Sequence, residues 1–170
     1  MDSAVILVED MYEELELWYP YHRLREAGLD VFLVGPEARS YQGRYGYPAQ
    51  AKATPGDVSL DQVAALVIPG GYSPDRMRRD PSMVALVRDM HERGGVIGAI
   101  CHAGWMLIEA DVVKGHRLTG FFSISRDLVN AGGVYVDEPV VVDGGLITSR
   151  SPDDLPSFGS ALAAAVTASR

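Results

Sequence analysis

The sequence contains a single cysteine, Cys101, among 170 residues. One cysteine excludes an intramolecular disulfide and favours a reducing compartment. No charged-then-apolar leader precedes the first apolar run, so we expect a cytoplasmic protein. No apolar run approaches the roughly 20 residues that cross a bilayer, and we therefore expect no membrane contact.

Clusters of basic residues are also absent from the sequence. The chain carries 15 Lys and Arg against 23 Asp and Glu, a formal net charge of −8, which argues against nucleic acid and anionic lipid surfaces as partners. No set of His, Cys, Asp and Glu shows metal-ligand spacing, and no phosphate-cradling Gly/Ser/Thr loop follows the first apolar run. We therefore expect neither a metal nor a cofactor. Without internal repeats or low-complexity linkers, residues 1–170 are predicted to form a single domain.

The apolar runs that are present are short and alternate with helical patterns. Runs typical of buried parallel strands occur at residues 4–8, 31–34, 64–68 and 96–100. Periodicity and capping residues predict helices over residues 12–27, 81–93, 105–110, 124–131 and 155–168. This alternation predicts an α/β fold in which helices cover both faces of a mostly parallel sheet. Apolar runs on either side of Asp143-Gly144-Gly145 add a β-hairpin near the C-terminal end.

Residues 36–57 interrupt this alternation. They lack a helical period and contain turn residues, which indicates an irregular hairpin or excursion at one edge of the sheet. Three tyrosines in this stretch either form a contact with another subunit or pack the loop against the sheet: Tyr41, Tyr45 and Tyr47. The sequence leaves both interpretations open.

Cys101 lies at a predicted strand-to-helix turn, between the strand at 96–100 and the helix at 105–110. The free N–H groups at the start of a helix favour a thiolate, so this position suits a nucleophile. A lone cysteine can also be a small buried apolar residue. Cys101 by itself does not separate the two interpretations.

Groups from three strands are predicted to meet near Cys101, because the carboxyl ends of parallel strands lie at the same edge of a sheet. The first strand leads to an acidic helix that contains Glu16, and the third ends at Gly70-Gly71. This convergence favours a thiol-based site. His102 is the obvious neighbour, but adjacent residues on a turn point apart unless the backbone is unusual, so a simple Cys–His pair is not required. The remaining histidines are interpreted as structural: His22, His91 and His116.

Several segments, in the same order along nearly the whole chain, resemble the PfpI intracellular-protease branch of the ThiJ/PfpI superfamily. The most specific are Ile100-Cys101-His102, the Gly-Gly turn of Leu66-Val-Ile-Pro-Gly-Gly71, and the helix Glu13-Glu-Leu-Glu-Leu-Trp-Tyr-Pro-Tyr-His-Arg-Leu24. Shorter matches are Asn130-Ala-Gly132, Val141-Val-Asp-Gly144 and Thr148-Ser-Arg150.

The resemblance implies a flavodoxin-like three-layer α/β sandwich. It also implies that Cys101 is the nucleophile, that Glu16 is the helix carboxylate hydrogen-bonded to it, and that the backbone N–H groups of Gly71 and His102 form an oxyanion site. In such proteins the histidine is paired with an acid from a neighbouring subunit. Asp75 occupies that place here, one methylene shorter than the usual glutamate. A homo-oligomer, dimer or hexamer, is therefore expected.

The expected chemistry is attack of the Cys101 thiolate on a carbonyl group of a small compound or a peptide. The first interpretation is a cysteine hydrolase or peptidase, in which His102 and the intersubunit acid assist. The alternative is a cofactor-free glyoxalase or deglycase, in which Cys101 forms a hemithioacetal with a reactive carbonyl such as methylglyoxal, and Glu16 or His102 moves the proton. A third interpretation is a non-enzymatic redox-sensing stress protein or chaperone that uses oxidation of the thiol.

Overall fold

The computed structural model describes residues 3–168. A six-stranded sheet forms its centre, in the order β2-β1-β5-β6-β10-β9. The strands are β1 (Ser3–Leu7), β2 (Asp30–Val34), β5 (Val63–Ile68), β6 (Val96–Ile100), β9 (Val140–Asp143) and β10 (Leu146–Ser149). All neighbours are parallel except β9 and β10, which pair antiparallel as the predicted hairpin.

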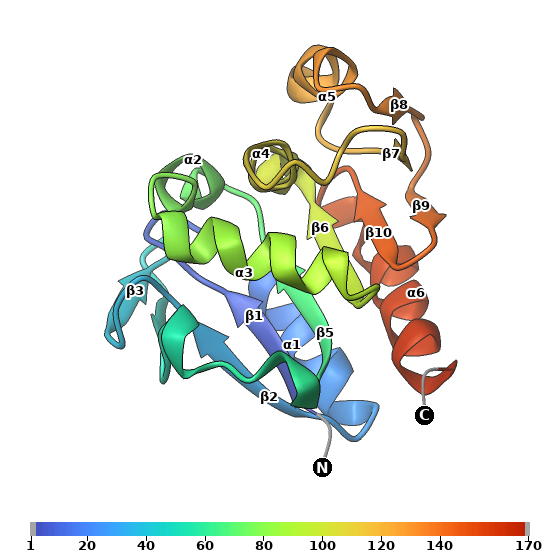
Figure 1. Cartoon of the computed structure of the whole chain (residues 1–170). Helices are drawn as coiled ribbons and strands as arrows, with labels where there is room; N and C mark the ends of the chain where they lie inside the picture. The colour runs from blue at the N-terminus through green and yellow to red at the C-terminus, as the bar shows by residue number, and fades with distance from the viewer. Residues whose placement is uncertain (1–2, 169–170) are drawn as a thin grey trace.

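Helices cover both faces of this sheet, as the apolar strands require. Figure 1 shows α3 (Pro81–Glu92) crossing in front of the sheet, whereas α1 (Glu14–Glu26) lies behind it. The last helix, α6 (Leu155–Ala168), packs beside α1. Alternate side chains of β1 enter the two cores: Val5 and Leu7 on the α3 side, Ala4 and Ile6 on the α1 side. The predicted flavodoxin-like sandwich is thus confirmed.

The edge excursion is a small antiparallel pair, β3 (Ser40–Gln42) and β4 (Pro48–Gln50). Of its three tyrosines, Tyr41 is fully buried, while Tyr45 and Tyr47 are exposed. Tyr41 therefore packs the excursion against the sheet, and only the other two are free to meet another molecule.

Smaller elements connect the strands of the second half. They are α4 (Gly104–Glu109), α5 (Ser125–Asn130) and a short parallel pair, β7 (Arg117–Leu118) with β8 (Val134–Tyr135). A further helix, α2 (Ser73–Met77), follows the Gly-Gly turn and was not predicted, because five residues with a proline in the first turn show no helical period. Asp75 lies on this helix.

Helix α1 begins at Glu14 and not at residue 12. Met11 has a φ of 67°, which is left-handed and not helical, and Tyr12 forms bridges to both Gly43 and Gly71, so the helix starts only after these two residues. Glu13 caps the helix by accepting a hydrogen bond from Glu16 N at 2.9 Å. The cap fixes the first turn, and thereby the position of Glu16.

No helix among the described residues is long and apolar enough to span a membrane. Within the same residues, no three His, Cys, Asp or Glu side chains gather as a metal site would require.

Candidate active site

Cys101 stands on a strained turn between β6 and α4. Its φ is 63°, a left-handed conformation that residues with a Cβ rarely adopt. This backbone turns the side chain away from the strand direction, so the thiol lies at the carboxyl edge of the sheet with only 8% of the residue exposed. Strain of this kind persists only where the surrounding structure holds it, and such residues cluster at functional sites.

Because of this strain, glycine is expected to stabilise the protein at position 101, whereas it destabilises at positions of ordinary backbone conformation. We expect the free energy of unfolding of Cys101→Gly to be about 1 kcal/mol higher than that of Cys101→Ala, because glycine adopts a positive φ without a steric cost. Ala103, in the same turn, has an ordinary φ of −59°. Ala103→Gly is therefore expected to lower stability by roughly 1 kcal/mol. Urea unfolding of the three variants and wild type tests this, and a lower stability for Cys101→Gly than for Cys101→Ala would contradict it.

His102 contacts the thiol, contrary to the expectation that adjacent side chains point apart. His102 Nδ1 lies 3.2 Å from Cys101 Sγ, and the positive φ of Cys101 is the unusual backbone that allows it. The other ring nitrogen, Nε2, lies 3.3 Å from Ser123 Oγ, and the ring stacks on Phe121 with centroids 4.9 Å apart. Burial, and then the positive charge of Arg44, lower the pKa of His102. The imidazole is thus neutral at neutral pH and able to accept the thiol proton.

Glu16 is fully buried and lies against the thiol. Its Oε2 accepts a hydrogen bond of 2.7 Å from Gly70 N, while Oε1 has no nitrogen or oxygen partner among the described residues. Burial, and then the charge of Glu13, raise the pKa of Glu16 to about 8. Glu16 is therefore mainly protonated at neutral pH, and its carboxyl can donate a hydrogen bond.

The Gly-Gly turn after β5 completes the site. A Cβ at Gly70 would lie 2.5 Å from Glu16 Oε2 and 2.8 Å from Cys101 Cβ, so only glycine lets these groups approach. Gly71 has a φ of 79°, and its N–H and that of His102 are both directed at the sulfur. The two predicted oxyanion donors thus converge on the atom that would attack a carbonyl.

The thiol is not activated in the way the sequence suggested. Burial, and then the charge of Glu16, raise the pKa of Cys101, and the N–H groups of His102 and Gly71 only partly oppose this. The N–H groups act in the expected direction, but burial outweighs them. The thiol must instead lose its proton during attack, and His102 is placed to take it.

Asp75 is exposed on α2 and has no contact with His102 within the described chain. Its pairing with His102 of another subunit remains a prediction. The remaining histidines have other partners: His116 Nδ1 lies 3.1 Å from Asp143 Oδ2, and His91 packs on the His116 ring. His22 packs against Trp18 and Tyr21.

Sequence reasoning missed Phe121, Ser123 and Arg44 as neighbours of His102. Phe121 and Ser123 belong to the connection before α5, and Arg44 belongs to the loop between β3 and β4. No pattern in the sequence links these segments to position 102, because the fold alone brings them together.

Comparisons of the sequence and the fold with known proteins identify the family of this chain. A model of the DJ-1/PfpI family matches residues 2–165. The chain is 39% identical over 153 residues to Deglycase PfpI of Pyrococcus furiosus, which covers 90% of this chain and 92% of the relative. It is 38% identical over 157 residues to the protein named Putative cysteine protease YraA of Bacillus subtilis, covering 92% and 93%. The crystal structure of Drosophila melanogaster DJ-1beta superposes with a TM-score of 0.89 at 30% identity, covering 98% of this chain and 94% of that one. With this fold, this cysteine turn and these relatives, the chain belongs to the DJ-1/PfpI family.

Proposed function

We propose that the protein is a cysteine-dependent, cofactor-free enzyme that acts on reactive α-oxoaldehydes and their adducts, the deglycase alternative of the sequence analysis. One observation carries the proposal: the thiol of Cys101 lies between a protonated carboxyl, Glu16, and a neutral imidazole, His102. The relative named Deglycase PfpI supports it.

The first step forms a carbon–sulfur bond. As Cys101 Sγ attacks the aldehyde carbon, His102 Nδ1 accepts the thiol proton. The N–H groups of Gly71 and His102 stabilise the charge that develops near the sulfur and the carbonyl oxygen. With methylglyoxal, the protonated carboxyl of Glu16 gives its proton to the alkoxide oxygen, so the product is a hemithioacetal and Glu16 is left as a carboxylate. With an amine adduct, the same attack displaces the amine, which leaves with a proton.

The second step moves a proton within the adduct. A carboxylate at Glu16 takes the proton from the carbon that bears sulfur, and the resulting carboxyl returns it to the neighbouring carbon, which converts the hemithioacetal to a thioester. Water then hydrolyses the thioester to lactate and restores the thiol. A pKa of Glu16 near 8 suits a group that must both accept and donate a proton near neutral pH.

Peptide hydrolysis, which the sequence analysis placed first, is the second candidate. The contact between Cys101 and His102 favours it, and so does the relative named a putative cysteine protease. An amide leaving group needs an oriented acid, however, and among residues 3–168 the hydrogen-bond partner at His102 Nε2 is Ser123. We propose that Asp75 of a second subunit supplies this orientation in a homo-oligomer.

The two candidates give different products. The purified protein is incubated with the methylglyoxal adduct of N-acetylarginine, and free N-acetylarginine and lactate are measured; a panel of chromogenic peptides is assayed in parallel. We expect lactate and the free amine to appear together. Cleavage of peptides without lactate formation would refute the deglycase proposal in favour of hydrolysis.

A further inference from the structure

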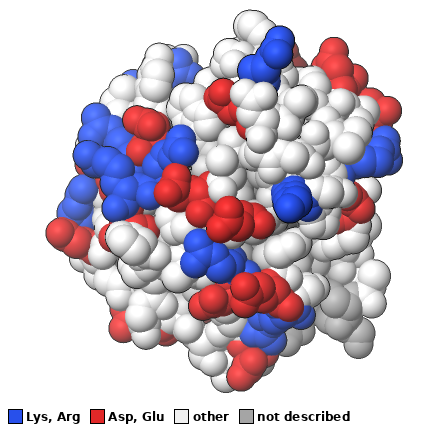
Figure 2. Space-filling view, turned by 45° about the horizontal axis from the view of Figure 1, so that its top comes forward, with Lys and Arg blue, Asp and Glu red and all other residues white. Residues whose placement is uncertain are grey.

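Three arginines lie around the entrance to the Cys101 site, although the chain as a whole is acidic. We refer to Arg44, Arg76 and Arg79 as the mouth arginines. Figure 2 shows basic side chains gathered at the left of the face, on the side where α2 and β3 lie in Figure 1. Arg76 and Arg79 line a depression of about 560 Å³ together with Tyr72 and Trp105. Trp105, which also lines the depression, packs edge-on against the His102 ring with centroids 5.1 Å apart, and His102 in turn contacts the thiol.

Arg44 is held at this entrance by the backbone. Arg44 N donates a hydrogen bond of 2.9 Å to Tyr12 O, and Tyr12 is bridged to Gly71, an oxyanion donor. The guanidinium carbon lies 5.4 Å from the ring centroid of Tyr72, the residue after Gly71. Burial, and then the charge of Arg44, lower the pKa of His102, whereas burial raises the pKa of Glu16 and the charge of Arg44 opposes this only weakly. The cation therefore acts on the reacting groups themselves.

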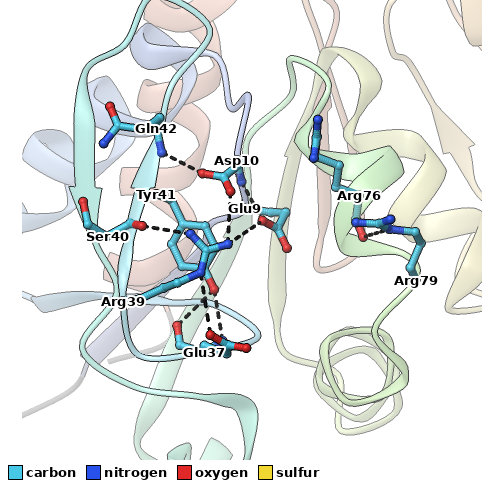
Figure 3. Close-up of polar contacts among 9 residues, drawn as sticks. All are labelled: Glu9, Asp10, Glu37, Arg39, Ser40, Tyr41, Gln42, Arg76 and Arg79. Atoms are coloured by element: carbon cyan, nitrogen blue, oxygen red, sulfur yellow. Dashed lines mark hydrogen bonds and ion pairs between the residues drawn. The ribbon is translucent and has the colours of Figure 1, made fainter.

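The mouth arginines differ from Arg39, whose charge is neutralised nearby. Figure 3 shows Arg39 among three carboxylates: it lies 3.0 Å from Asp10, 3.6 Å from Glu9 and 3.8 Å from Glu37. Within residues 3–168, none of the mouth arginines forms an ion pair with a carboxylate, and the one carboxylate lining the depression is Asp75. Direct ion pairs therefore do not neutralise the mouth arginines within residues 3–168, and the charge of Arg76 also acts on Asp10.

We propose that the carbonyl substrate of this site carries an anionic group, a carboxylate or a phosphate, which Arg44 binds while Cys101 attacks the carbonyl carbon. The planar guanidinium presents paired donors that match both groups, and its stacking on Tyr72 limits its motion. The inference rests on the proposed function for the identity of the carbonyl chemistry. Recognition of charge by Arg44 is separable from it, because alkylation of Cys101 by a charged and a neutral reagent does not involve the carbonyl chemistry.

The first test uses two alkylating reagents that differ in charge but are nearly equal in size, iodoacetate and iodoacetamide. Rates of alkylation of Cys101 are measured by mass spectrometry for wild type, Arg44→Gln and Arg93→Gln. Arg93 follows the last residue of α3 and pairs with Asp61. It lies where β6 begins, at the end of the strand away from Cys101, so its variant loses the same charge far from the thiol. The ratio of the two rates is the readout, because a change in the thiol pKa alters both rates alike.

We expect Arg44→Gln to lower the ratio of iodoacetate to iodoacetamide rates about tenfold, the usual effect of one charge-assisted hydrogen bond. Arg93→Gln should leave the ratio at the wild-type value. A ratio that does not respond to Arg44→Gln, or a Cys101 that neither reagent alkylates, would overturn the proposal.

The second test uses turnover and separates the two anions. Wild type and Arg44→Gln are compared on methylglyoxal, on 4,5-dioxopentanoate, which adds a carboxylate, and on 3-phosphooxy-2-oxopropanal, which adds a phosphate. We expect wild type to prefer at least one anionic substrate and the variant to lose that preference. If no α-oxoaldehyde is turned over, the proposed function fails, while the alkylation ratio still decides the role of Arg44.

Discussion

Replacing Cys101 by alanine is expected to lower kcat/KM for methylglyoxal by at least about a thousandfold, the scale seen when a covalent nucleophile is removed. The sulfur forms the bond to substrate in every step of the proposed mechanism, and the groups around it converge on that one atom. Neither the carboxyl of Glu16 nor the imidazole of His102 can form the thioester. Lactate formation, measured with an enzymatic lactate assay, gives the rate.

The fold should survive this change, because alanine keeps the Cβ and removes one buried atom. Circular dichroism and urea unfolding of Cys101→Ala check that point. Cys101→Ser is the stricter control, since it keeps a hydrogen-bonding group of similar size but with a far less acidic hydroxyl. It too should be inactive. A rate close to wild type for either variant would show that the chemistry does not pass through the sulfur.

Glu16 should make the protein less stable as the pH rises through neutrality. Its pKa is about 8 in the folded chain against an ordinary value of 4.5. Between these values the folded state holds a proton that the unfolded state has released, so the stabilisation is complete below pH 4.5, falls as pH rises, and levels off above pH 8. The free energy of unfolding falls by up to about 1.4 kcal/mol per pH unit, so its total loss over this range is on the order of 5 kcal/mol.

Glu16→Gln should remove this dependence, because the amide does not titrate and its oxygen can still accept the hydrogen bond from Gly70 N. Urea unfolding across the same pH range measures it. Glu26→Gln, on the same helix, is the matched control, since Glu26 forms only an exposed ion pair with Arg23 at 3.1 Å. The control should follow wild type. Identical curves for Glu16→Gln and wild type would mean that the pKa of Glu16 is the same in the folded and the unfolded chain.

The sequence predicted the features that depend on neighbouring residues. The buried strands, the Asp80 cap of α3, and the convergence of Gly70-Gly71 with Cys101 all follow from local residue patterns and from the geometry of parallel sheets. A strand of apolar residues can only be central, and a central parallel strand delivers its last residue to the shared edge. That reasoning places Cys101, the predicted nucleophile, at this end of the sheet without further information.

Features that depend on distant segments were not predictable. The positive φ of Cys101, which brings His102 to the sulfur, is held by contacts with other loops and leaves no mark on the residue type. The N–H groups at the turn lower the pKa of the thiol as predicted, but burial raises it by more, and burial is a property of the folded chain. Arg44 was not predicted as a neighbour of the site for the same reason, since no residue pattern near position 44 indicates that the fold brings it to the cysteine turn.

The attachment of the β3–β4 hairpin also bears on how such an enzyme can change its substrates over time. The hairpin is fixed by main-chain hydrogen bonds: Met11 N donates to Gln42 O at 2.7 Å, and Arg44 N donates to Tyr12 O at 2.9 Å. Backbone bonds are indifferent to side-chain identity, so exposed positions such as Arg44 and Tyr45 can be substituted while the nucleophile stays in place. Selection can then act on the entrance and on the reacting groups separately. A chain with this hairpin can therefore acquire a new substrate preference through a single substitution.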